Sequence, residues 1–173
     1  TYYDDYDFLL LDAFSALPAV SPSSYASAAG LPTGSLTAVL GEPQQETIDD
    51  GPTVAVPFQP IASVTFYDTE ERPVKTVSTT HLADTHEQTE TTYTLDNQPR
   101  KVSHTLKYKD ETYDDSYEYS YDRIGRLTGV TASWPWANIT DVDIETDVYN
   151  SIGQLVSSGS GSSATAYSYD IRG

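Results

Sequence analysis

The side chains in this sequence that first suggest chemistry are the carboxylates of residues 141–148. Four acids alternate there with apolar residues, and carboxylate oxygens are ligands that Ca²⁺ prefers. They are Asp141, Asp143, Glu145 and Asp147. Side chains two positions apart on a strand lie about 7 Å from one another, which is too far to close a coordination cage unaided. We therefore interpret this row as a solvated strand face and predict no metal site.

Three histidines and a glycine-serine run are the remaining candidates for catalysis or cofactor binding. His81, His86 and His104 are scattered, whereas a metal site or a general base needs convergence with oriented partners. The run at 159–164 loosely matches a dinucleotide fingerprint, but that motif works only between a parallel strand and a helix. A Ser–His–Asp triad assembled from distant residues stays open, although no nucleophile motif supports it. We predict no catalytic residue, no cofactor and no enzyme activity.

Two tryptophans form the one candidate ligand site. Trp134 and Trp136 flank a rigid proline at a predicted hairpin end, where two indoles are able to stack on a sugar ring or a partner protein. The alternative is that they pack on a neighbouring segment of the chain. We favour packing and keep the platform as the second interpretation.

The elements that carry these residues are set by a repeat that begins with tyrosine. Its copies read YDTEERP, YTLDNQP, YDRIGRL and YNSIGQL, and a shortened copy, YDIRG, closes the sequence. The first tyrosines are separated by 26, 28, 28 and 20 residues, and such regular recurrence predicts a repeat fold. The residues that define the motif are Tyr67, Asp68, Tyr93, Asn97, Tyr121, Asp122, Gly125, Arg126, Tyr149, Asn150, Gly153, Tyr169, Asp170 and Gly173.

Each copy reads as a strand, a tight turn and a second strand. Its second position holds Asp, Asn or Thr, short oxygen-bearing side chains that bond backbone N–H groups at the start of a turn. Its fifth position is mostly Gly or Asn, which accept positive φ. The first copy has Glu71 there, so we expect a distorted turn in that copy. Before the turn, Tyr117, Tyr119 and Tyr121 alternate with polar residues, as one face of a strand requires.

A second break lies near the middle of each interval, at residues 83–88, 109–115, 134–138 and 159–163. Every repeat thus supplies two strands and two opposite turns. No stretch keeps a helical apolar period beyond about three turns. The sequence predicts an all-β fold of long antiparallel hairpins with little helix.

This pattern resembles the Rhs or YD-repeat family, named for its Tyr-Asp dipeptide, over about residues 61–173. The family includes bacterial Rhs and wall-associated proteins, toxin-complex shells and teneurins. The resemblance implies hairpins that form a segment of a curved or spiralling β-shell. It implies a non-catalytic wall of a secreted or cell-surface bacterial protein that encloses or presents a C-terminal effector or toxin. The alternative function is a surface adhesin that binds a glycan or another protein.

The amino-acid composition limits the classes of binding partner that this chain is expected to have. With 26 acidic and 9 basic residues the formal net charge is −17, which argues against nucleic acid and anionic lipid, because both are bound largely through Lys and Arg. The charge favours simple solubility or a basic cargo. The absence of cysteine excludes disulfides, and no stretch of about 18 apolar residues would insert into a membrane. Since methionine is also absent, we expect a fragment whose partners include the remainder of its own polypeptide.

Two regions are predicted along the chain. Residues 1–60 form an irregular N-terminal segment with short strands and a Ser/Ala/Pro/Gly-rich loop over about residues 15–35, because proline removes backbone donors and glycine raises the cost of ordering. Within it, residues 1–12 read as either a strand end or a short helical turn. Residues 61–173 form the region of YD-repeat hairpins.

Overall fold

The computed structural model describes residues 1–22, 25–38, 44–47, 53–56, 60–82 and 84–170 of the chain. The strands are β1 (Tyr2–Asp4), β2 (Ala28–Thr37), β3 (Gln44–Thr47), β4 (Thr53–Val56), β5 (Ile61–Tyr67), β6 (Pro73–Thr79), β7 (Thr85–Tyr93), β8 (Pro99–Tyr108), β9 (Glu111–Tyr121), β10 (Leu127–Trp134), β11 (Ile139–Thr146), β12 (Val148–Tyr149), β13 (Leu155–Ser158) and β14 (Thr165–Ala166). The 3₁₀ turns are η1 (Asp7–Leu10), η2 (Asp12–Phe14), η4 (Pro135–Ala137) and η5 (Gly161–Ser163). These ranges contain no α-helix.

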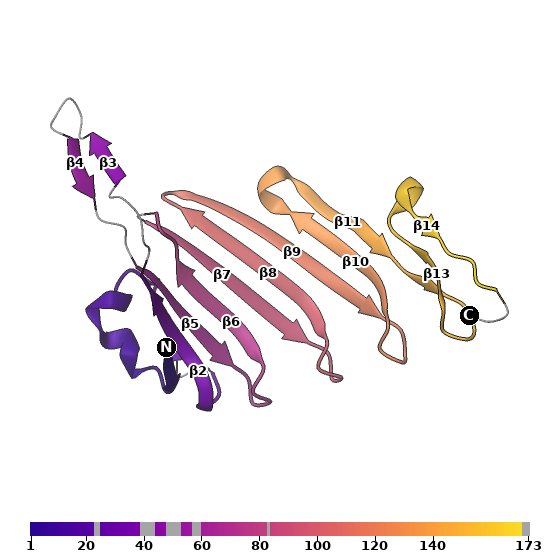
Figure 1. Cartoon of the computed structure of the whole chain (residues 1–173), viewed down its shortest axis with the longest axis horizontal. Coiled ribbons are helices and arrows are strands. Elements are labelled where there is room, and N and C mark those ends of the chain that lie inside the picture. The colour runs from indigo at the N-terminus through magenta and orange to yellow at the C-terminus, as the bar shows by residue number, and fades with distance from the viewer. Residues whose placement is uncertain (23–24, 39–43, 48–52, 57–59, 83, 171–173) are drawn as a thin grey trace. The chain divides into compact units, whose positions relative to one another are not determined.

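The sheet follows the chain, as consecutive hairpins require. In the described part, nine strands form an open sheet in the order β1-β2-β5-β6-β7-β8-β9-β10-β11 (Figure 1). Strands β12, β13 and β14 form a small second sheet, and β3 pairs with β4. The prediction of an all-β fold of antiparallel hairpins with little helix is confirmed.

The predicted breaks agree with the strand ends to within a few residues. The second breaks lie at 80–84, 109–110, 135–138 and 159–164. The first of them comes earlier than expected, because β7 already begins at Thr85. At the N-terminus, residues 1–12 supply both expected structures, a short strand (β1) and a 3₁₀ turn (η1).

The chain divides into two compact units. Unit 1 contains residues 1–90 and 105–112, and unit 2 contains residues 91–104 and 113–173. The boundary that we predict after residue 60 lies inside unit 1, where β2 pairs with β5 from Gly34↔Val64 to Thr37↔Ile61.

Unit 1 has its core on one face of β5 and β6. Alternate residues of β5 are buried, as period 2 requires, and the N-terminal segment covers them. The buried cluster consists of Phe8, Phe14, Ala62, Val64, Phe66 and Val77. Tyr6 and Tyr25 both stack on Phe66, with ring centroids 4.9 and 4.4 Å away. The aromatic residues of the N-terminal segment thus act as the second layer of this core.

The loop predicted over about residues 15–35 is wrong in its second half, where β2 begins at Ala28. Proline and glycine are tolerated in β2 because register shifts interrupt its pairing with β1 and Gly30 adopts φ 81°. Gly34 has a different role, since a Cβ there would overlap the Phe8 ring. Tertiary packing therefore overrides the local preference of this segment for irregular structure.

Unit 2 is thin. Among its described residues only Val130 and Ala132 are buried, and most strand residues are half-buried. Such a sheet depends on its backbone ladder, its cross-strand pairs and its turns more than on a thick core.

Candidate functional site

The turn between β9 and β10 shows how one copy of the motif is built. Oδ1 of Asp122 accepts hydrogen bonds from the backbone N–H groups of Ile124 and Arg126, both at 3.0 Å. Gly125 N–H donates to the Asp122 carbonyl, and the Asp122 N–H donates to the Arg126 carbonyl. Oδ2 accepts from Nε of Arg126 at 2.7 Å and also contacts its Nη2. One carboxylate thus closes the backbone turn and holds the guanidinium that follows it.

The other described copies have the same turn. Counting from the tyrosine, the position-2 N–H bonds the position-6 carbonyl in every one of them, and the position-5 N–H bonds the position-2 carbonyl. The four corners, as we call these turns, span residues 68–72, 94–98, 122–126 and 150–154. Position 5 has φ of 61°, 62°, 84° and 91° in chain order, as predicted from its Gly and Asn residues. In the fifth copy, Tyr169 and Asp170 are exposed, whereas Gly173 lies outside the described residues.

The expected distortion of the first corner is wrong. Glu71 adopts φ 61° and keeps the corner geometry, with its N–H 3.2 Å from the Asp68 carbonyl. Oδ1 of Asp68 accepts from Glu70 and Arg72 N–H at 2.9 and 3.0 Å, and these bonds hold the turn despite the unfavourable residue.

Replacing Glu71 with glycine is expected to raise the free energy of unfolding by about 0.5–1 kcal/mol. The gain arises because left-handed backbone costs an ordinary L-residue about 1–2 kcal/mol, part of which glycine loses again in chain entropy. Urea denaturation followed by circular dichroism measures it. Asn97→Gly is the matched control, with a smaller gain because asparagine already tolerates this region. A destabilised Glu71→Gly variant would contradict the prediction.

The side-chain contact between positions 2 and 6 was not predicted from the sequence, although Arg126 is among the predicted motif residues. Arg72 and Arg126 follow an aspartate at position 2, whereas Gln98 and Gln154 follow threonine and asparagine. In the fourth corner Nδ2 of Asn150 donates to Oε1 of Gln154 at 2.9 Å, a neutral version of the Asp–Arg pair. A charged residue at position 2 therefore occurs with a charged residue at position 6, and a neutral residue at position 2 occurs with glutamine at position 6. This covariation inside one sequence was the signal that could have shown the pair.

Successive corners of unit 2 also contact one another. Nε2 of Gln98 donates to the Gly125 carbonyl at 2.6 Å, and the Arg126 guanidinium lies over the Tyr149 ring, 4.2 Å from its centroid. A Cβ at Gly125 would lie 3.4 Å from the Gln98 amide, and one at Gly153 would lie 3.2 Å from Nη1 of Arg126. The glycine therefore serves both the positive φ and the close approach of the preceding corner.

The motif tyrosines make a second set of links. The Tyr121 hydroxyl donates to the Pro99 carbonyl and the Tyr169 hydroxyl to the Leu155 carbonyl, both at 2.8 Å. In each case the acceptor is position 7 of the preceding copy. In unit 1 the Tyr67 hydroxyl donates to the Pro32 carbonyl at 2.6 Å. In these three copies the length and the hydroxyl of the tyrosine at position 1 allow it to reach a backbone carbonyl on an adjacent segment.

The aspartates of the first and third corners make the stability of these corners depend on pH. Burial alone raises the pKa of Asp68, but hydrogen bonds from the Arg72 side chain and from the Arg72 and Glu70 N–H groups outweigh it and hold the pKa below its usual value. For Asp122 the Arg126 N–H bond is the main cause of a lowered pKa. Because the folded-state pKa lies below the unfolded one, the contribution of these carboxylates is present above about pH 4 and is lost as the pH falls through the folded-state pKa.

We expect the variant Asp68→Asn/Arg72→Gln, which rebuilds the neutral pair seen in the fourth corner, to lose less stability than the parent chain between about pH 5 and pH 3. Urea denaturation midpoints at both pH values measure the difference. The variant Asn150→Asp/Gln154→Arg makes the reciprocal change and should increase the acid sensitivity. Parallel pH profiles for all three chains would show that the corner carboxylates do not titrate with folding.

Each of the two tryptophans contacts a tyrosine ring. Trp134 makes an edge contact with Tyr117, at a centroid distance of 6.4 Å, and Trp136 makes one with Tyr113, at 5.7 Å. Both tyrosines belong to β9, so each indole packs on the neighbouring strand, as the favoured interpretation has it. Trp136 nevertheless remains 56% exposed.

The acidic row of β11 does not keep to one face. The pairing register shifts so that Asp143 is opposite Thr131 while Glu145 is opposite the next residue, Val130. Neighbouring residues of β10 point to opposite faces, so the one-sided row that we predict is interrupted by a bulge. In the described residues no group of three His, Asp or Glu side chains could hold a metal ion.

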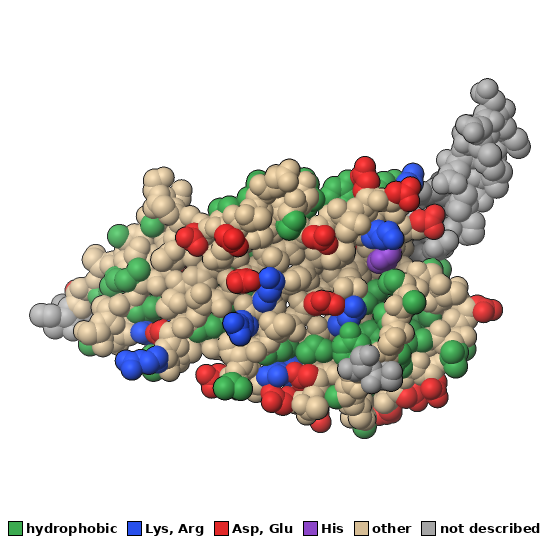
Figure 2. Space-filling view, turned by 180° about the vertical axis from the view of Figure 1, so that it is seen from behind, with side chains coloured by type: hydrophobic (Ala, Val, Ile, Leu, Met, Phe, Trp, Pro, Cys, Tyr) green, Lys and Arg blue, Asp and Glu red, His purple; other side chains and the backbone are tan. Residues whose placement is uncertain are grey.

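Charged side chains elsewhere in the sheet pair across strands. Lys75 contacts Glu90 at 3.0 Å and Lys101 contacts Glu118 at 2.8 Å. Figure 2 shows lysine and arginine side chains beside acidic ones on this face of the sheet. Nδ1 of His104 lies 3.1 Å from Oδ1 of Asp115. All three contacts join residues on adjacent strands and are therefore cross-strand pairs.

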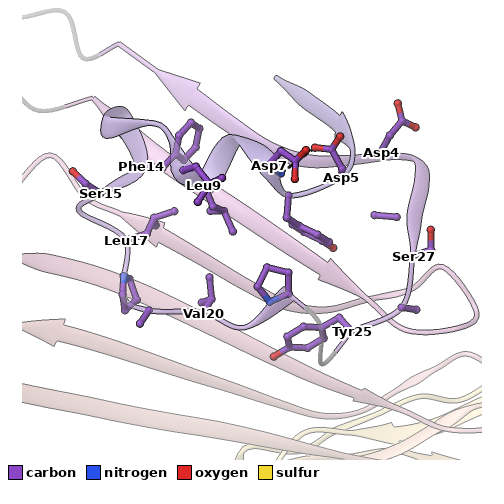
Figure 3. A pocket seen from close by; sticks show the side chains of 17 residues that line it. Asp4, Asp5, Asp7, Leu9, Phe14, Ser15, Leu17, Val20, Tyr25 and Ser27 are labelled. Atoms are coloured by element: carbon purple, nitrogen blue, oxygen red, sulfur yellow. Dashed lines mark hydrogen bonds between the residues drawn. The ribbon is translucent and has the colours of Figure 1, made fainter.

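A groove in unit 1 was not predicted from the sequence. Its volume is about 760 Å³, within the range of about 300–1,000 Å³ typical of ligand pockets. Figure 3 shows aspartates on one side and apolar side chains around the rest. The aspartates are Asp4, Asp5 and Asp7, and the apolar lining includes Leu9, Phe14, Leu17, Val20, Pro22 and Tyr25. The groove arises because residues 4–22 and 25–28 fold back over the sheet, the first of these segments through η1 and η2.

One wall of the groove is fixed by Tyr6. Its hydroxyl donates to the Thr65 carbonyl at 3.1 Å, and its ring stacks on Phe66. Burial, followed by the nearby Tyr67 and Tyr25, raises the pKa of Tyr6 to about 12.

No protein-family model matches this chain, and no curated protein sequence matches it either. None of the helical segments within the described ranges is long and apolar enough to cross a membrane.

Proposed function

We propose that this chain is a non-catalytic structural segment of a YD-repeat wall in a secreted or surface-displayed bacterial protein, where it encloses or presents a C-terminal effector. The observation that carries the proposal is the corner geometry, because four copies share the same two backbone hydrogen bonds. The bacterial and extracellular setting rests on the resemblance to Rhs proteins.

The corners explain how such a wall is extended. Within unit 2 the corners at 94–98 and 122–126 contact the following copy through position 6, Gln98 at the Gly125 carbonyl and Arg126 at the Tyr149 ring. A hairpin that is added at the end of the sheet is therefore able to bond both the backbone groups of the edge strand and the position-6 side chain of the last corner.

The tyrosines suit a lining that holds another chain. Tyr117 is opposite Ala132 and Tyr119 is opposite Val130, so these four residues share one face of the sheet. Half-buried tyrosines give this face an apolar body with polar tips, which suits contact with many different segments.

A deletion series tests the repeat wall. Removing residues 122–149, one full interval, joins Tyr121 to Asn150 and leaves the fourth corner intact. We expect this chain to keep its β circular dichroism and a cooperative unfolding transition. Removing residues 135–148 takes out β11 and forces the next corner to the opposite edge, so this half-repeat chain should misfold. Equal behaviour of the two deletions would overturn the proposal.

Enclosure is tested on the full polypeptide that carries this chain. Limited trypsin digestion should leave the segment downstream of the repeats protected while the repeats are intact. The same segment produced alone should be cleaved rapidly. Equal cleavage rates would leave the wall without an enclosing role.

A second candidate function is adhesion through Trp136, whose exposed ring is free to stack on a sugar or a partner protein. A glycan array distinguishes the two. Specific binding that disappears in the variant Trp134→Ala/Trp136→Ala would favour adhesion over a purely structural role.

A further inference from the structure

We propose that the groove of unit 1 binds a short cationic, apolar peptide segment of a partner protein. The Lys or Arg side chains of that segment pair with the aspartate rim, and its apolar side chains lie against the groove wall. The inference is independent of the proposed wall function.

The apolar side chains that line the groove are the reason to expect apolar side chains in the partner. Leu9, Leu17, Val20 and Tyr25 are each half-buried against the core cluster, so their other sides face the groove and remain in water. Leu10, which also lines the groove, is 87% exposed. Covering these side chains removes apolar surface from water, which favours an occupant with apolar side chains of its own.

The aspartates at the rim of the groove are the reason to expect cationic side chains in the partner. Asp4, Asp5 and Asp7 are exposed, and no ion pair found in the described residues includes any of them. One oxygen of Asp4 accepts the Gly30 N–H at 2.6 Å, and one oxygen of Asp5 accepts the Asp7 N–H at 3.1 Å. These bonds fix two of the carboxylates in place without neutralising them.

The lining of the groove carries no positively charged side chain. None of the 17 residues that line the groove is Lys, Arg or His, and the first cationic residue of the sequence is Arg72. That residue is already paired with Asp68 and Glu70. An uncompensated acidic rim beside an apolar wall is complementary to a basic, apolar ligand, and it repels acidic segments.

The test is fluorescence anisotropy with labelled, end-capped peptides and the intact 173-residue chain. The probe has the sequence RLKLR. Its two controls are RSKSR, with equal charge and no apolar side chains, and ELELE, with the charge reversed. We expect RLKLR to bind, to bind at least about tenfold more tightly than RSKSR, and to weaken as salt is raised from about 50 to 300 mM. ELELE should not bind.

Matched variants assign the binding to the groove. Asp5→Asn/Asp7→Asn removes two rim charges and keeps an acceptor oxygen for the Asp7 N–H, so binding should weaken about fivefold. Glu87→Gln/Asp96→Asn removes the same charge from exposed positions elsewhere and should leave binding within about twofold. Leu10→Ser should weaken binding while the unfolding midpoint stays unchanged, because this side chain is exposed.

Three results would overturn the inference. The first is absence of RLKLR binding to the parent chain. The second is equal binding of RLKLR and RSKSR, which would indicate general attraction to an acidic protein. The third is equal weakening by the rim and distant charge variants, which would place the contact outside the groove.

Discussion

Replacing Phe66 with alanine is expected to lower the free energy of unfolding by about 3–5 kcal/mol, the usual cost of emptying a buried phenylalanine site. Phe66 is fully buried near the end of β5, and the rings of Tyr6 and Tyr25 both stack on it. Its removal would leave a cavity between the sheet and the N-terminal segment, and both tyrosines would lose their stacking partner.

Urea denaturation followed by far-ultraviolet circular dichroism measures this loss. Phe66→Leu is the matched control, and its cost should be clearly smaller because most of the buried volume is kept. Hydrogen exchange should show faster opening of residues 61–67 in the alanine variant. A loss below about 1 kcal/mol would mean that the N-terminal segment is not part of the core.

Replacing Gly34 with alanine is expected to cost about 1–3 kcal/mol, because the new methyl group would overlap the Phe8 ring. Phe8 is 5% exposed and stacks on Tyr2 at a centroid distance of 4.7 Å, so it cannot move away without disturbing the core. Because the new methyl group clashes with a side chain and not with the backbone, a smaller residue at position 8 should relieve the clash.

The same substitution in a Phe8→Leu background should therefore cost less than in the parent chain. The comparison is a double-mutant cycle, and a favourable coupling between the two sites is the expected result. Additive effects would show that Gly34 is needed for a reason other than room for the ring.

Several parts of the fold could be predicted because their signals are local. The alternation of Tyr117, Tyr119 and Tyr121 with polar residues predicted the strand that is β9, and the turn chemistry of Asp122 and Gly125 predicted the corner between β9 and β10. Period 2 and side-chain-to-backbone bonding act within a few residues, so one sequence is enough to reveal them.

The parts that could not be predicted depend on contacts distant in sequence. β2 runs through Pro32 and Gly34 because its neighbours β1 and β5 pair with it and the Phe8 ring fits over the glycine. Glu71 keeps a left-handed turn because Asp68 holds two N–H groups. The groove forms only when residues 4–22 and 25–28 fold over β5, so no residue spacing in the sequence predicts it.

The matched polarity of positions 2 and 6 limits how such a chain can recombine during evolution. An unequal crossover inside a strand exchanges whole corners and keeps Asp with Arg or Asn with Gln. A crossover inside a corner would join Asp122 to Gln154, or Asn150 to Arg126, and leave one charge without its counterpart. Gene duplications that lengthened this array should therefore have their breakpoints in the strands, and the pair should be inherited as a block together with the three residues between its members.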